Sequence, residues 1–239
     1  IFRVDNPHTK PFAFWQWLIG EIRADHPDVV FLAEAFTRPR VLERLAKVGF
    51  DQSYGYFTWK RTPTELREYL RDLDEVADFL RPNLWPNTPD ILTEQLQNGG
   101  RPVFESRAVL AALLAANYGV YGPAYELLEA QPVRRPSEDY ASSEKYEVRR
   151  WDLDEPQSIA PLLRRLNEIR AAHPALHSDR RRVFHHCDDP GVLAWSKRSF
   201  DGRDVILVMV NVEADLTRSG MVRLDLDALG LPPGATFPV

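Results

Sequence analysis

The feature that most constrains the fold is a continuous apolar run from Val29 to Ala33, with no polar residue between its ends. Such a run is typical of a parallel strand that is buried on both faces, because a strand with one solvated face would alternate. Glu34 follows directly. In a barrel of alternating strands and helices, the carboxyl end of each strand carries the chemistry.

Strand and helix patterns alternate along most of the chain, which predicts an α/β fold. We expect strands over residues 2–5, 29–34, 53–57, 83–86 and 119–122, and helices over 11–25, 39–48, 63–80, 104–117 and 158–172. A polar loop is expected around residues 98–100 and an irregular stretch over 123–157.

The pattern changes at about residue 181, where strands are expected over 182–186, 192–196 and 204–210. Turn residues at 189–191 and 201–202 separate them, which predicts an antiparallel module, interpreted as a partial β-sandwich. We therefore expect two domains, residues 1–180 and residues 181–239. The chain begins at Ile1 with a strand already under way, so we expect a fragment cut at both ends.

Three acidic residues stand where catalytic groups could lie. Arg3 and Asp5 would share one face of a strand, and a guanidinium beside a carboxylate lowers its pKa, as a carboxylate nucleophile requires. Glu34 ends a buried strand, and Asp90 closes an Asn-Thr-Pro-Asp segment. Taken singly, these residues could be a surface ion pair, a solvated strand cap and a turn.

In combination, these motifs resemble those of the α-amylase superfamily, glycoside hydrolase family 13. The matching segments are F-R-V-D at 2–5, F-L-A-E at 31–34 and N-T-P-D at 87–90. Further segments resemble one branch, the α-1,4-glucan:maltose-1-phosphate maltosyltransferases: R-V-D-N-P-H-T-K-P at 3–11, L-A-E-A-F-T-R-P at 32–39 and S-E-K-Y-E at 143–147. The resemblance implies the second half, about strands four to eight, of a TIM (β/α)8 barrel, followed by a truncated antiparallel β domain, with the first three strands upstream.

The resemblance also implies roles. Asp5 would be the nucleophile, Glu34 the acid/base, Asp90 a transition-state stabiliser, and Arg3 the group that orients the nucleophile. Two carboxylates about 5–5.5 Å apart support double displacement with retention. The implied reaction moves maltosyl units from α-maltose 1-phosphate to the non-reducing end of an α-1,4-glucan. An amylase-type hydrolase or transglycosylase, and a non-catalytic carbohydrate-binding barrel, are the alternatives.

Three further residues are assigned to substrate by the same resemblance: Asn6 to the donor phosphate, and Lys145 and Tyr146 to the donor maltose. Pro89 stands where general amylases have a His before the third carboxylate, which favours the maltosyltransferase branch. Other aromatic residues near strand ends could line sugar subsites or belong to the core: Tyr54, Tyr56, Trp59, Trp85 and Tyr121.

No metal or cofactor is expected. His185 and His186 precede Cys187, but successive strand residues face opposite sides. His8 could support the site, although a lone His is more often structural.

Composition excludes several partner classes. The net charge is −5 and no basic block occurs, so nucleic acid and anionic membranes are not expected partners. The single cysteine favours a reducing compartment, and no apolar run approaches the roughly 18 residues of a membrane span. We expect a cytoplasmic protein, and a homodimer of the complete protein is left open.

Overall fold

The computed structural model describes residues 1–213, 216–232 and 234. Its first sheet has five parallel strands that pair in chain order: β1 (Phe2–Asp5), β2 (Phe31–Glu34), β3 (Gln52–Tyr54), β4 (Pro82–Leu84) and β5 (Asn117–Tyr118). Since all strands run the same way, their carboxyl ends meet at one edge. The expected α/β fold with consecutive parallel strands is confirmed.

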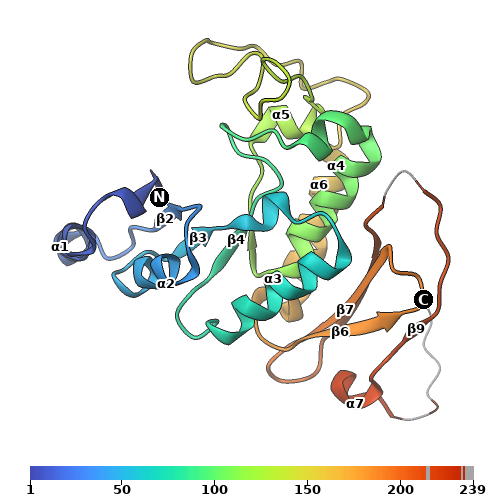
Figure 1. Ribbon diagram of the computed structural model, residues 1–239. Coiled ribbons are helices and arrows are strands. Elements are labelled where there is room, and N and C mark those ends of the chain that lie inside the picture. Colours follow the sequence, from blue (N-terminus) through green and yellow to red (C-terminus); the bar gives the residue numbers. More distant parts are fainter. Residues whose placement is uncertain (214–215, 233, 235–239) are drawn as a thin grey trace.

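Helices connect these strands: α1 (Phe12–Asp25), α2 (Pro39–Lys47), α3 (Pro63–Glu75) and α4 (Glu94–Leu114). Short 3-10 turns follow the first and third strands at η1 (Pro7–Thr9) and η2 (Tyr56–Trp59). Figure 1 shows α1 and α2 beside the first strands, whereas α3, α4 and α6 (Ala160–Ala172) lie beside the later ones. The alternation of strand and helix is that of a (β/α)8 barrel.

The second sheet is antiparallel and has the strand order β8-β7-β6-β9. Its strands follow α6 and the 3-10 turn η3 (Pro174–His177), and they are β6 (Arg182–Cys187), β7 (Val192–Arg198), β8 (Val205–Asn211) and β9 (Val222–Arg223), with α7 (Leu226–Leu229) after them. The expected antiparallel module is confirmed. Residues 214–215, 233 and 235–239 of the expected range 181–239 lie outside the described residues.

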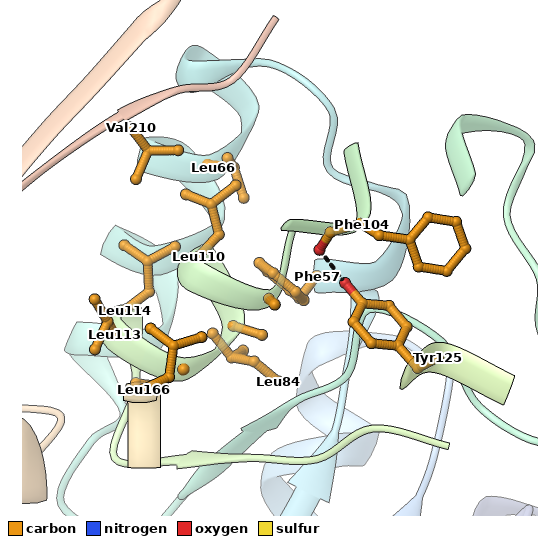
Figure 2. Packing of buried hydrophobic residues seen from close by; sticks show 14 of the residues in the cluster. Phe57, Leu66, Leu84, Phe104, Leu110, Leu113, Leu114, Tyr125, Leu166 and Val210 are labelled. Atoms are coloured by element: carbon orange, nitrogen blue, oxygen red, sulfur yellow. Dashed lines mark hydrogen bonds between the residues drawn. The ribbon is translucent and has the colours of Figure 1, made fainter. Parts of the chain in front are cut away.

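The main hydrophobic core joins the two sheets. Side chains of α4 pack between the barrel strands and the antiparallel module, as Figure 2 shows for Leu110, Leu113 and Leu114 between Leu84 and Val210. Trp195 of β7 is fully buried in this core, and its indole N–H donates to the Leu113 carbonyl at 3.3 Å. A smaller separate core lies between α1, α2 and the first two strands.

Several expected boundaries are wrong. The strand expected over 53–57 ends at Tyr54, because the next residues form η2. The helix expected to start at 104 begins at Glu94, and the expected loop lies within it as a kink at Gly100, whose φ of 59° suits glycine. The strand expected over 119–122 lies at Asn117–Tyr118, and the irregular stretch begins with α5 (Gly122–Glu126).

No helix in the part of the chain that the structure describes is long and apolar enough to cross a membrane.

Candidate active site

Asp5 and Glu34 are direct neighbours at the carboxyl edge of the parallel sheet. They end β1 and β2 and lie opposite each other in the register of the two strands. After β1 the chain turns at Asn6, whose φ of 47° and ψ of 48° are left-handed, and its amide donates to the Glu34 carbonyl at 3.1 Å. The Asn6 side-chain amide donates to Asp5 Oδ1 at 2.8 Å. Asn6 therefore ends the strand and holds the Asp5 carboxylate.

Asp90 reaches the same place from the loop after β4. Thr88 and Ile91 close this loop with a bridge, and the Asp90 amide lies 3.2 Å from the Thr88 hydroxyl. The buried Asn87 anchors the loop, because its amide group donates to the Tyr140 hydroxyl at 2.7 Å and accepts from the Tyr121 amide at 2.9 Å.

Arg3 joins two of the carboxylates. Its Nη2 pairs with Glu34 and lies 3.1 Å from Asp90 Oδ2. The sequence suggested that Arg3 would orient Asp5, but the hydrogen-bond partner of Asp5 among the described residues is Asn6. The orienting role of Arg3 therefore stays a prediction, and its observed contacts are a bridge between the other two acids.

The electrostatics of the cluster centre on Glu34, whose side chain is 4% exposed. Burial raises the pKa of Glu34, Arg3 opposes this rise, and the charges of Asp90 and Asp5 add to it. Both aspartates thus act on one buried carboxyl group. Where one carboxyl group has a raised pKa and its neighbours are more exposed carboxylates, the first can act as a general acid and a neighbour can act as the nucleophile.

Lys145 and Tyr146 approach the cluster from the long stretch after α5. The Lys145 ammonium pairs with Asp90, and this hydrogen bond raises the pKa of Lys145. Tyr146 is 85% exposed and lies at a hollow of about 340 Å³ that Pro89, Tyr140 and Ser143 also line. The contact between Lys145 and Asp90, 55 residues apart in sequence, was not foreseen.

The remaining aromatic candidates separate into buried and open groups. Tyr54 is buried and stacks on Trp85, whereas Tyr56, Trp59 and Phe36 form a partly exposed cluster. The Trp59 N–H donates to Glu138 at 3.0 Å, and the Tyr121 hydroxyl pairs with Glu144.

The histidines singled out in the sequence lie in different settings. His185 is buried with its Nε2 2.9 Å from Ser196 Oγ, and His186 is exposed. His8 is partly buried and its Nδ1 makes no hydrogen bond within the described residues. Across the ranges 1–213, 216–232 and 234, no group of three or more His, Cys, Asp or Glu side chains is placed to hold a metal ion.

Comparison with solved structures gives the fold class. The structure matches an α-amylase from H. orenii with a TM-score of 0.68 at 17% identity, over 88% of this chain and 50% of that one. It also matches CldA, a cyclomaltodextrin glucanotransferase, with a TM-score of 0.70 at 14% identity, over 87% and 44%. The fold is thus that of the α-amylase class, a barrel of parallel strands followed by an antiparallel module.

Sequence comparison is more specific. The chain is 52% identical to α-1,4-glucan:maltose-1-phosphate maltosyltransferase 2 of Streptomyces coelicolor, over 100% of this chain and 36% of that protein. It is 50% identical to the Mycolicibacterium smegmatis maltosyltransferase, over 99% and 34%. The family model "GLGE, C-terminal" matches residues 184–239.

The expected resemblance is confirmed: the chain, which has an α-amylase-like fold, is similar in sequence to the α-1,4-glucan:maltose-1-phosphate maltosyltransferases. It spans about a third of the length of the relatives it matches.

Proposed function

We propose that the complete protein transfers maltosyl units from α-maltose 1-phosphate to the non-reducing end of an α-1,4-glucan, with retention of configuration. The observation that carries this proposal is that Asp5 lies beside Glu34 in the strand register and that Arg3 joins Glu34 to Asp90, in a chain about half identical to maltosyltransferases along its whole length. On this proposal, the complete protein is a glycosyltransferase that synthesises glucan.

In the first half of the reaction, Asp5 attacks the anomeric carbon and phosphate leaves with a proton from Glu34. The product is a glycosyl ester on Asp5. In the second half, Glu34 takes the proton from the acceptor hydroxyl, which attacks the same carbon, breaks the ester bond and releases the Asp5 carboxylate. The burial of Glu34 supports the acid role, because it raises the pKa of the carboxyl group. Asp90, held by Arg3 and Lys145, binds donor hydroxyls and stabilises the oxocarbenium-like transition state.

The donor is assigned to Asn6, Lys145 and Tyr146. Asn6 already donates one N–H to Asp5, and a side-chain amide has a second N–H that can reach a phosphate oxygen. Lys145 stands beside Asp90 and can donate to sugar hydroxyls, while the exposed ring of Tyr146 offers an apolar face to the sugar.

The test is to supply the complete protein with α-maltose 1-phosphate and a malto-oligosaccharide. Phosphate release together with glucans lengthened by two residues is the expected result. Phosphate release with free maltose would point to hydrolysis instead, and no phosphate release would overturn the proposal.

The proposed role of Asp5 as the nucleophile can be tested by substitution. Asp5→Ala should lower kcat roughly 10³-fold or more, because covalent catalysis loses its attacking group. The matched control is Asp28→Ala, which removes an exposed carboxylate from the loop before β2 and should leave the rate unchanged. Equal rates in both variants would instead favour a non-catalytic barrel.

We also propose three properties that follow from the sequence. The division into domains at residues 180 and 181 is supported by the change from parallel to antiparallel pairing. A homodimer of the complete protein and a cytoplasmic location remain predictions, to be checked by light scattering and by cell fractionation.

A further inference from the structure

Lys145 lies in a loop whose two ends are fixed to each other. This 142–151 loop belongs to the yellow loops next to α5 in Figure 1. The Arg149 guanidinium donates to the Ser142 carbonyl at 3.1 Å and lies over the Trp151 ring, 3.8 Å from its centroid. Arg149 also pairs with Glu129 at 3.0 Å, which connects the far end of the loop to the stretch after α5. Lys145 lies between these fixed ends.

Glu144, the residue directly before Lys145, joins the 142–151 loop to the barrel. One of its oxygens accepts from the Trp151 indole N–H at 3.2 Å, and the other accepts from the Tyr121 hydroxyl. Trp151 is part of the loop itself, whereas Tyr121 lies between β5 and α5. A single carboxylate therefore connects the part of the loop that carries Lys145 with the end of a barrel strand.

Tyr121 is fixed in turn by the residue that anchors the loop after β4. Its backbone amide donates to the Asn87 side chain at 2.9 Å, and its ring packs edge-on against the Tyr140 ring with centroids 5.6 Å apart. The Tyr140 hydroxyl accepts from the same Asn87 side chain at 2.7 Å. Asp90, three residues after Asn87, pairs with the Lys145 ammonium. The segment from Asn87 to Asp90 therefore holds Tyr121 at one end and Lys145 at the other.

The hydrogen bond between Tyr121 and Glu144 has a fixed direction. Burial raises the pKa of Tyr121, and the hydrogen bond and negative charge of Glu144 raise it further. The hydroxyl therefore stays protonated at neutral pH and donates to the carboxylate. Because the acceptor is charged, this hydrogen bond is stronger than one between neutral groups. Removal of the Tyr121 hydroxyl should therefore loosen the loop measurably.

We propose that Tyr121 and Glu144 are positioning residues, which hold Lys145 in place before the donor arrives. This inference deepens the proposed function and rests on it. A donor that binds to a mobile loop loses the free energy needed to order that loop, whereas a loop that is already fixed carries no such cost. Loosening the 142–151 loop should therefore weaken donor binding and leave the bond-forming steps little changed.

The first experiment compares Tyr121→Phe with wild type in the complete protein, using transfer from α-maltose 1-phosphate to a malto-oligosaccharide. We expect the donor KM to rise about three- to tenfold, the effect of one hydrogen bond, while kcat and the acceptor KM change by less than about twofold. The control is Tyr118→Phe, which removes a hydroxyl that donates to Asn167 on α6 at 2.7 Å. An unchanged donor KM in Tyr121→Phe, or an equal rise in the control, would overturn the inference.

Glu144 is tested by two substitutions of graded effect. Glu144→Ala removes both accepting oxygens, whereas Glu144→Gln keeps one of them and loses the charge. We expect the donor KM to be highest in Glu144→Ala and intermediate in Glu144→Gln, with kcat little changed in both. A wild-type donor KM in Glu144→Ala would show that this carboxylate does not position the loop.

A double substitution tests whether Tyr121 acts through Lys145. Tyr121→Phe should raise the donor KM less in a Lys145→Met protein than in wild type, because the side chain that the loop positions is already lost. If the two substitutions raise the donor KM by fully multiplicative factors, Tyr121 does not act through Lys145 and the proposed connection is wrong.

A further measurement does not depend on turnover. The amides of Tyr146 and Glu147 donate to the Ser143 carbonyl at 3.0 and 3.2 Å, so their hydrogen exchange reports the order of the loop. Exchange at these amides should be faster in Tyr121→Phe than in wild type or Tyr118→Phe, and equal rates in all three would contradict the inference. If wild type transfers no maltosyl units, the proposed function fails, while this measurement still decides whether Tyr121 orders the loop.

Discussion

Lys197 shows how one residue can lower the stability of its own module. It lies on β7 with no exposed surface, and its ammonium group has no hydrogen-bond partner among the residues described. The negative charges of Asp179 and Asp74 and the positive charges of Arg182 and Arg170 lie near enough to act on it. Burial lowers the pKa of Lys197 to about 7, and Asp179 only partly opposes this. The folded state therefore carries an unpaired buried charge at neutral and lower pH.

The lowered pKa of Lys197 makes the stability of the fold depend on pH. Below about pH 7 Lys197 is protonated in both states and the penalty on folding is complete. Between pH 7 and the ordinary lysine pKa of about 10.4, the unfolded chain binds more protons, so this contribution to stability improves as pH rises. Lys197→Met should raise the free energy of unfolding by roughly 2–4 kcal/mol at pH 6 and by much less at pH 10. Urea denaturation at both pH values measures this, with the exposed Lys10→Met as control; a loss of stability at pH 6 would contradict it.

At the scale of elements, the start of α3 is specified by its own sequence. Thr62 accepts from the Glu65 amide at 3.2 Å, and Glu65 accepts from the Thr62 amide at 2.9 Å, which completes a capping box, with Pro63 at the first helical position. Backbone hydrogen bonds from Thr62 and Arg61 lower the pKa of Glu65, so this support is present above the ordinary glutamate range and is lost as the pH falls.

Thr62→Ala should lower the free energy of unfolding by about 1 kcal/mol, the usual effect of removing an N-cap. The matched control is Thr64→Ala, which changes an exposed residue two positions later in the same turn. Thermal unfolding of the two variants measures the difference, and equal midpoints would show that the cap does not stabilise α3.

The elements that could be predicted from sequence are those whose signals are local. The helix expected from residue 63 starts there, and the apolar run before Glu34 predicted β2 within two residues. The start of α4 was missed because Gly99 and Gly100 were interpreted as a loop, whereas two helical segments join there across a kink at Gly100, which has a positive φ. Similarly, the acids of the candidate site could be named from their motifs, but the contact between Lys145 and Asp90 could not be predicted, since it depends on the path of an irregular segment.

At the scale of the whole molecule, the barrel strands and the antiparallel module share one core. Trp195 is the largest fully buried side chain and packs from β7 against α4, and Leu193, Val208 and Val210 belong to the same cluster. His173 and Asp204, 2.9 Å apart, add a polar contact between the end of α6 and the loop before β8. A destabilising substitution in the antiparallel module should therefore also destabilise the barrel helices.

Trp195→Ala should lower the free energy of unfolding by about 3–5 kcal/mol, as large-to-small core substitutions do. We expect hydrogen exchange to accelerate at amides of both β7 and α4, because they share the cavity that is created. Phe200→Ala, which changes a side chain that is 64% exposed, should leave α4 unchanged. Acceleration confined to β7 would show that the two parts open independently.

The anchoring of the loop after β4 by Asn87 has an evolutionary consequence. Because Asn87 binds both Tyr121 and Tyr140, the chain between these tyrosines can change length without displacing Asp90. The stretch from Tyr140 to Lys145 cannot change length in this way, since Tyr140 is bound to Asn87 at one end and Lys145 pairs with Asp90 at the other. Among natural homologues, insertions and deletions should gather around the exposed Arg134 and Arg135 and spare the five residues that follow Tyr140.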